Sequence, residues 1–168
     1  MHLVVETRAP ALSERTISLR AKRMLLALQM EKAELSIVLT GDKQIHKLNK
    51  LYRGKDRPTD VLAFAMQEGE FGAVSAGLLG DVIVSIPTAA RQARERDVAP
   101  LDEVTMLIAH GILHLLGWDH DTDAKDRAMR KETDRLCAAA VGGRERPSRV
   151  RASLSSTRPS VKAGKRKR

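Results

Sequence analysis

The chain has 168 residues, a length typical of one domain with a sizeable core, and it carries a formal net charge of +9. Its one cysteine, Cys137, excludes an intrachain disulfide and a zinc cluster built from several cysteines, so a reducing cytoplasm is the expected location. The first ten residues, MHLVVETRAP, lack the basic start and apolar run of a secretory signal, and the longest apolar stretch, Met106 to Trp118, is too short to span a bilayer. We therefore expect no membrane partner.

The first part of the chain alternates between strand and helix patterns. A short strand is expected over 3–7, followed by a helical periodicity over 13–30. A second strand is expected over 35–40, and a helix over 42–52 that Asp42 can cap.

Two strand patterns and three helix patterns follow. The strands TDVLAFAM (59–66) and GDVIVSI (80–86) are joined by the Gly-containing segment EGEFGAVSAG, which predicts an antiparallel pair. Helices are expected over 87–96, 100–117 and 122–140, the first two with proline in the first turn. This order predicts an α/β (α+β) fold, a small mixed four-stranded sheet with about five helices.

The positive charge lies entirely at the C-terminal end. From Gly142 onward the chain has ten Lys and Arg and one acid, whereas residues 1–141 have twenty of each sign. Residues 1–141 are therefore the expected domain, and 142–168, rich in Ser, Pro, Gly and Arg, are expected to be a disordered basic tail. Such tails usually contact polyanions such as nucleic acid, and a solubilising extension is the alternative. The RNA-binding candidates in this tail are Lys165, Arg166, Lys167 and Arg168.

The segment HGILHLLGWDH carries three histidines in an apolar setting. His110 and His114 lie four residues apart, so a helix places both on one face. Gly117 can end that helix in the left-handed conformation and reverse the chain, which returns His120 toward the first two. A satisfied core histidine is the alternative for one imidazole, but burying two among Leu and Ile is costly without partners for their nitrogens. The spacing predicts a metal site on a helix and the following turn.

The residue types of this site favour zinc and a catalytic role. Three neutral imidazoles suit Zn²⁺ first, with Ni²⁺, Cu²⁺ or Fe²⁺ as alternatives, and three protein ligands leave a tetrahedral ion open to water. We expect one Zn²⁺ per chain. Gly111 stands where HExxH peptidases have the glutamate base, which argues against an ordinary peptidase. The remaining histidines, His2 and His46, show no such pattern.

Three motifs in one order resemble the YbeY family of bacterial endoribonucleases, also called rRNA maturation factors. HGILHLLGWDH resembles the family signature H-G-x-L-H-L-x-G-[YW]-D-H, YRGKDRPTDVLAF (52–64) resembles YRxKDxPTDVLSFP, and LLGDVIVS (78–85) resembles its LGDI-type strand. The resemblance extends from about Leu35 to Leu136. It implies a compact α/β fold, and zinc-dependent cleavage of single-stranded RNA in 16S rRNA 3′ end maturation and 30S quality control.

The resemblance also implies roles for individual residues. It implies that His110, His114 and His120 hold the zinc, and that Arg53 corresponds to the pocket arginine of the family. The chain departs from the family at two positions on the strand beside the pocket. Ala63 replaces the usual Ser and Ala65 the usual Pro, so a hydroxyl contact common in the family is absent.

The contacts expected with RNA rest on charge. Arg53, Lys55 and Arg57 form a basic cluster that can hold phosphates, and a solvated loop beside Asp56 and Asp60 is the alternative. Aromatic residues are scarce, which argues against a stacking platform of the RRM or OB type.

Three further residues near the motifs have two interpretations each. Trp118 is the aromatic residue best placed to touch a base, but we expect it to pack over the metal turn. Asp81 and Asp119 are candidates to orient a ligating imidazole from behind, with strand-end capping and turn formation as their alternatives.

The sequence thus predicts a zinc-dependent endoribonuclease acting on rRNA or its precursors, with Arg53 stabilising negative charge on phosphate. The expected partners are rRNA and the small ribosomal subunit, and a monomer is expected. Two alternatives remain: a non-catalytic ribosome-assembly factor with structural zinc, and a zinc peptidase with an atypical base.

Overall fold

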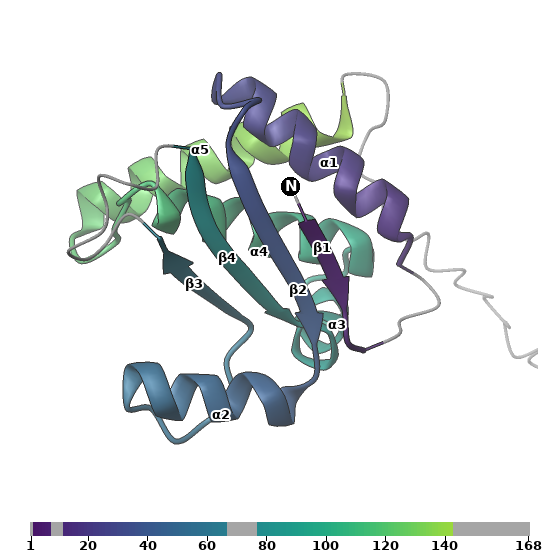
Figure 1. Cartoon of the computed structure of the whole chain (residues 1–168), viewed down its shortest axis with the longest axis vertical. Coiled ribbons are helices and arrows are strands. Elements are labelled where there is room, and N and C mark those ends of the chain that lie inside the picture. Colours follow the sequence, from purple (N-terminus) through teal and green to yellow (C-terminus); the bar gives the residue numbers. More distant parts are fainter. Residues whose placement is uncertain (1, 8–11, 67–76, 143–168) are drawn as a thin grey trace, which may run out of the picture.

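One mixed sheet of four strands organises the structure, a computed structural model that describes residues 2–7, 12–66 and 77–142 (Figure 1). The strands lie in the order β1-β2-β4-β3. The strand β2 pairs in parallel with β1 and β4, and the edge strand β3 pairs antiparallel with β4. Their bounds are β1 His2–Val5, β2 Glu34–Thr40, β3 Val61–Ala65 and β4 Leu78–Ser85. The predicted mixed sheet and its antiparallel pair are confirmed.

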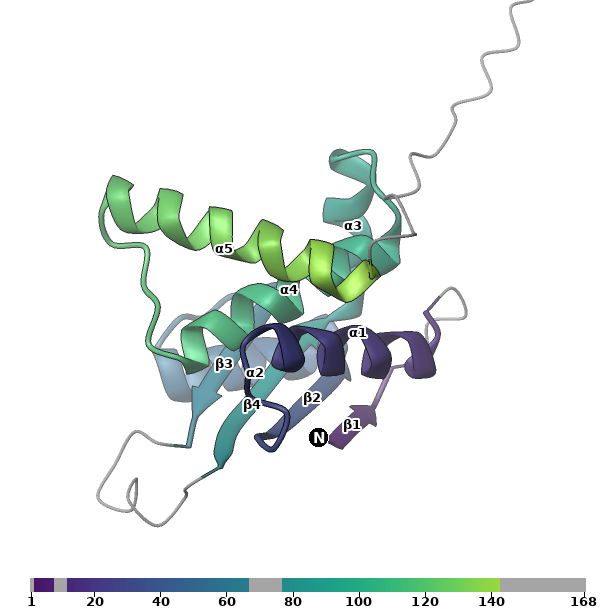
Figure 2. The same ribbon diagram turned by 90° about the horizontal axis from the view of Figure 1, so that it is seen from above.

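Five helices cover the sheet unequally. The helices α1, α4 and α5 lie on one face, with α5 packed on α1 and α4, while α2 lies on the other face near one end of the sheet (Figures 1 and 2). Their bounds are α1 Glu14–Ala27, α2 Asp42–Arg53, α3 Ile86–Glu95, α4 Pro100–Leu115 and α5 Asp123–Val141. The expected α+β fold with about five helices is confirmed.

The alternation of side chains along β4 explains the two cores. Val82 and Val84 point to the larger core beneath α1, α4 and α5, whereas Ile83 points to a smaller core with Ile45 of α2 and Leu62 of β3. Successive side chains of a strand project from opposite faces, so this buried strand needs apolar residues on both. The two faces therefore offer different environments to any polar group on β4.

Polar contacts hold α4, the helix that carries two of the histidines, against α1 and the end of α3. Arg20 of α1 donates to Asp102 at 2.7 Å and to Thr105 at 2.8 Å, and Arg96 pairs with the buried Glu103 at 2.9 Å. Burial raises the pKa of Glu103, and the charge of Arg96 opposes that shift.

The expected capping of α2 by Asp42 is wrong. The N-cap is Gly41, which has no side chain to cap the helix, and Asp42 is the first helical residue. The Asp42 carboxylate instead accepts hydrogen bonds from Ser85 and Thr88, at the junction of β4 and α3. These hydrogen bonds, that of Ser85 first, lower the pKa of Asp42. Asp42 therefore interacts with Ser85 and Thr88, which are distant in the sequence, and not with the backbone N–H groups of its own helix.

Among the described residues, no single helix is long and apolar enough to cross a membrane. The helices α3 and α4 reach that length and apolar character only when taken together, and a bend of 114° separates them. The tail expected to be disordered, apart from Gly142, lies outside the described residues.

Candidate metal centre

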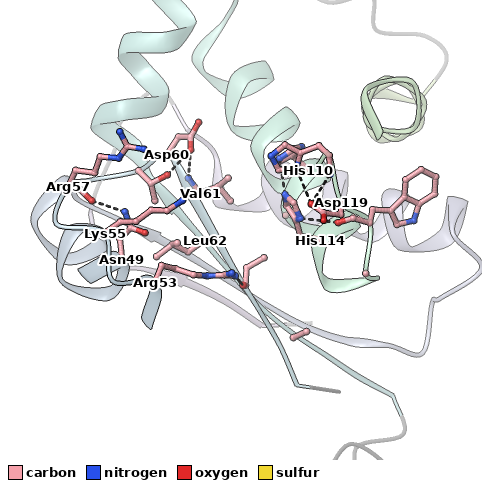
Figure 3. Close-up of a pocket in the computed structure, with 17 residues that line it drawn as sticks. Asn49, Arg53, Lys55, Arg57, Asp60, Val61, Leu62, His110, His114 and Asp119 are labelled. Carbon is pink, nitrogen blue, oxygen red and sulfur yellow. Dashed lines mark hydrogen bonds and ion pairs between the residues drawn. The ribbon is translucent and has the colours of Figure 1, made fainter. Parts of the chain in front are cut away.

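The three histidines of the HGILHLLGWDH segment come together at the C-terminal end of α4. His110 and His114 project from one face of the helix, and their Nε2 atoms are 3.1 Å apart (Figure 3). Gly117 takes the left-handed conformation with φ 79°, and the chain turns back so that His120 joins them. One ligand atom from each of the three lies within 4.8 Å of the others. The structure therefore brings together all three predicted ligands.

The imidazoles have the orientation and the charge that a metal ion requires. The Nδ1–H of His114 donates to the carbonyl oxygen of Trp118 at 3.0 Å, which leaves its Nε2 lone pair facing His110. Two zinc–nitrogen bonds of about 2.0–2.1 Å at a tetrahedral angle place their nitrogens roughly 3.3 Å apart, close to the observed separation. The three residues thus fit a bound cation.

Burial keeps the imidazoles of His110 and His114 neutral at pH 7. It is the largest cause that lowers the pKa of His110 to about 4, and the neighbouring His114 and His120 lower it further. Burial also lowers the pKa of His114, followed by the effect of His120. Since only the neutral ring offers a lone pair, these two ligands are ready for a cation at pH 7 without losing a proton first.

A cavity of about 610 Å³ joins the histidines to the basic cluster. One wall is formed by the C-terminal end of α2 and the loop after it, with Arg53, Lys55 and Arg57. The strand β3 lines the cavity between this wall and α4 (Figure 3). Residues that are far apart in the sequence therefore surround one space.

Arg53 is the last residue of α2 and is held by the edge strand. Its guanidinium donates to the carbonyl oxygen of Ala63 at 3.0 Å, and its remaining donors are free to meet a ligand in the cavity. Its charge also contributes to the lowered pKa of His114, after burial and His120. Arg53 and the three histidines thus line the same cavity.

Asn49 holds the loop that carries Lys55 and Arg57, and sequence reasoning missed it. Its buried side chain donates to the carbonyl oxygen of Arg57 at 2.7 Å, and its own carbonyl accepts from the Lys55 N–H at 3.2 Å. Gly54, left-handed with φ 66°, permits the turn. Asparagine is unfavourable inside a helix, so its presence within the amphipathic helix α2 could have indicated a role outside the helix.

Asp119 and Asp81, the two candidates to orient a ligating imidazole, occupy different places in the structure. Asp119 accepts from the backbone N–H of His120 at 2.7 Å, which forms the turn, and its carboxylate is 3.7 Å from the His120 ring. Asp81 is not brought to the histidines. It points from β4 to the face opposite α4, where it lines a separate hollow with His2 and Ser36.

Asp60 is a second residue that sequence reasoning did not select. Its carboxylate accepts from the Val61 N–H at 2.8 Å and from Gln92 Nε2 at 2.9 Å, and it lines the cavity. Its negative charge opposes the burial that lowers the pKa of His110. In the sequence, the only local indication of this role is that Thr59 and Asp60 directly precede the strand β3.

Comparisons with known proteins agree with this geometry. The family model described as "Endoribonuclease YbeY" matches residues 4–140. The chain belongs to the YbeY endoribonuclease family. It is 46% identical over 125 residues to a Geobacter metallireducens protein named Endoribonuclease YbeY, covering 74% of this chain and 83% of that protein. Another of that name, from Aquifex aeolicus, is 47% identical over 114 residues, or 68% of this chain and 74% of its own.

A solved structure shows the same fold. The solution structure of a Thermotoga maritima protein matches with a TM-score of 0.60 and 23% identity, covering 85% of this chain and 91% of that one. The enzyme class follows from the family, and the predicted endoribonuclease activity is confirmed at that level.

The two departures from the YbeY motif lie on the cavity wall. Ala63 and Ala65 both line it, and the carbonyl oxygen of Ala63 accepts from Arg53. At position 63 the side chain offers no hydroxyl, so the wall meets a ligand through backbone and methyl groups.

We predict that His110 makes the metal-free protein less stable in mild acid. The His110 pKa is about 4 when folded and 6.5 as its ordinary value, so the unfolded chain binds more protons between these values. The free energy of unfolding should therefore fall as the pH is lowered from about 6.5 to 4. Urea unfolding at pH 7.5 and pH 5 tests this. A His110→Gln variant should show a smaller drop, and an equal drop would contradict this origin.

Proposed function

We propose that this YbeY-family endoribonuclease cleaves single-stranded RNA with a zinc ion held by His110, His114 and His120. The observation that carries this proposal is the cavity that sets three imidazoles, two of them with lowered pKa values, opposite a wall of cationic side chains. Cleavage of RNA requires groups that bind a metal ion and cationic groups, because the negative charge of the phosphate must be stabilised while a P–O bond breaks. We further propose rRNA as the substrate, with 16S rRNA 3′ end maturation and 30S quality control as the role.

The side chains that line the cavity have different proposed roles toward the phosphate. A zinc ion supplies Lewis acidity and a nucleophile from water at neutral pH. Arg53, anchored through Ala63, places its guanidinium to stabilise the negative charge that grows on the phosphoryl oxygens. Lys55 and Arg57, on the loop that Asn49 holds, bind neighbouring phosphates and position the strand.

The two alternative functions receive less support. An assembly factor with structural zinc would be expected to close the ion with a fourth protein ligand, whereas the group of possible ligands among the described residues has three members. The zinc peptidase requires an atypical base, because the glutamate that follows the first histidine in HExxH enzymes is absent. At position 111 a Cβ atom would lie 2.6 Å from Val82 Cγ1, so the packing of α4 on β4 excludes that residue.

Replacing Arg53 by alanine should reduce RNA cleavage by about 100-fold or more, because the charge stabilisation of the transition state is lost. Folding and zinc content should stay unchanged, since the side chain is exposed and is not a ligand. The measurement is the initial rate on a single-stranded rRNA fragment, together with elemental analysis. Arg127→Ala, an exposed arginine of α5 outside the cavity, is the control. Unchanged cleavage in Arg53→Ala would remove Arg53 from the mechanism.

Deleting residues 143–168 should weaken RNA binding and flatten its salt dependence, because this segment carries the whole net charge of +9. Each phosphate neutralised on a single strand adds a slope of about −0.7 to log K against log salt. Zinc content and thermal stability should be retained. Fluorescence anisotropy at several salt concentrations gives both slopes. Equal slopes would mean that the tail does not touch phosphates.

We also propose a cytoplasmic monomer that meets the small ribosomal subunit. The rRNA substrate and the single cysteine support this setting. Sedimentation of the protein alone, and with purified 30S particles, tests both statements.

A further inference from the structure

The Trp118 side chain projects into solvent beside the metal centre. Its backbone is held on both sides, since its N–H donates to Leu113 and its carbonyl accepts from His114. The side chain, however, is 38% exposed and is absent from the apolar cores of the described residues. Trp118 also lines the cavity of the metal centre, so its exposed indole surface is available to a ligand bound there.

The two sides of the cavity differ in charge. Arg53, Lys55 and Arg57 stand on one side. The turn around Trp118 and the start of α5 instead carry Asp119, Asp121 and Asp123 with one nearby cation, Lys125, which pairs with Asp121 at 2.8 Å. Phosphates are attracted to the first side, whereas the second side keeps a net negative charge that disfavours them. A strand that crosses the cavity therefore meets the basic wall with its backbone and the acidic turn with an uncharged group.

We propose that the Trp118 indole stacks on the base of a nucleotide that flanks the cleaved phosphate, and that the acidic turn excludes a second strand. This inference rests on the proposed cleavage of single-stranded RNA and names the residue that recognises the base. Every base has a π face, so stacking tolerates different sequences. In a duplex that face is covered by neighbouring pairs, and the second backbone brings phosphates to the acidic side.

The protein contains its own reporter for this contact. Trp118 is the only tryptophan of the chain, so its intrinsic fluorescence reports on this position alone. Mixing the zinc-loaded protein with a single-stranded RNA oligonucleotide in a stopped-flow instrument should quench the fluorescence before cleavage occurs. The same oligonucleotide annealed to its complement should cause little quenching. Oligonucleotides with one abasic position, moved along the strand, should lose the quenching at one site next to the cleaved bond.

Substitutions provide a second, independent measurement. Trp118→Leu should raise KM for single-stranded RNA about tenfold, the range expected for loss of one base–aromatic stack, with a smaller change in kcat. Trp118→Phe should restore most of the affinity, because it keeps an aromatic face. The matched control is Tyr52→Leu. Tyr52 is 61% exposed but packs against Phe64 and does not line the cavity, so its loss should leave KM unchanged.

The outcomes separate this inference from the function on which it rests. Zinc content and circular dichroism of each variant show whether the site and fold are intact, and the fluorescence of the unmodified protein requires no substitution. Cleavage of RNA without quenching, or an unchanged KM in a folded Trp118→Leu, would overturn the stacking proposal alone. Equal quenching by single strand and duplex would overturn the exclusion of a second strand. A parent protein that neither binds nor cleaves RNA would overturn the proposed function as well.

Discussion

Replacing His114 by alanine should reduce bound zinc from about one ion per chain to less than about a tenth, and RNA cleavage should fall to background. The same result is expected for His110→Ala and His120→Ala. Each change leaves two imidazoles, too few to hold the ion against water and buffer. The structure supports one shared site, because one ligand atom from each of the three lies within 4.8 Å of the others.

Elemental analysis after dialysis and the initial rate on single-stranded RNA measure this effect. His2→Ala is the matched control, because His2 lies on β1, at the sheet edge opposite β3, and lines a different hollow. The metal-free variants should keep their helical circular dichroism, since the apolar core beneath α4 is unchanged. Full zinc occupancy in any one of the three variants would show that its histidine is not a ligand.

Replacing Gly111 by alanine should destabilise the protein by about 1–3 kcal/mol, although alanine is the better helix former by about 1 kcal/mol. The added Cβ would lie 2.6 Å from Val82 Cγ1 and 3.1 Å from Cγ2. Val82 is fully buried in the inner strand β4, and its β-branched side chain is stiff about χ1. The helix must therefore move away from the sheet, and it carries His110 and His114 with it. Zinc affinity should decrease together with stability.

Urea unfolding of the single variants and of the pair tests this steric explanation. Val82→Ala alone opens a cavity and costs stability, but combined with Gly111→Ala it makes room for the new methyl group. The double variant should be more stable than the sum of the two losses predicts, with a coupling of about 0.5–3 kcal/mol. Additive losses would mean that the two side chains do not meet. Gly111→Glu should be less stable still and show no peptidase activity.

Local patterns predicted much of the fold for a physical reason. Alternating apolar residues in 59–66 and 80–86 decide which face of a strand is buried, so β3 and β4 were found and correctly paired. Proline in the first turn and Gly117 after the last turn marked the ends of α4, because their backbone preferences act within a few residues. The metal centre was found for the same reason, since one helix and one turn supply all three histidines.

Contacts between distant segments decided the rest. Asp42 could cap its own helix by sequence, yet Ser85 and Thr88 hold it, because the sheet brings the end of β4 to the start of α2. Asp81 had the right residue type to support a histidine, but its place in β4 sends it to the other face of the sheet. A shift of one position along a strand moves a side chain to the opposite face of the sheet, so only the register of the strands decides which face Asp81 occupies.

The sequence by itself determined the three candidate ligands, the helix that carries two of them, and the location of the net positive charge after residue 141, because each depends on neighbours along the chain. The tertiary structure alone decided that Arg53 faces the histidines across one cavity, that Gly111 is required by the approach of Val82, and that Trp118 remains exposed. These facts depend on how α2, β3 and α4 pack around the sheet. Packing is a property of many residues at once, and no short motif encodes it.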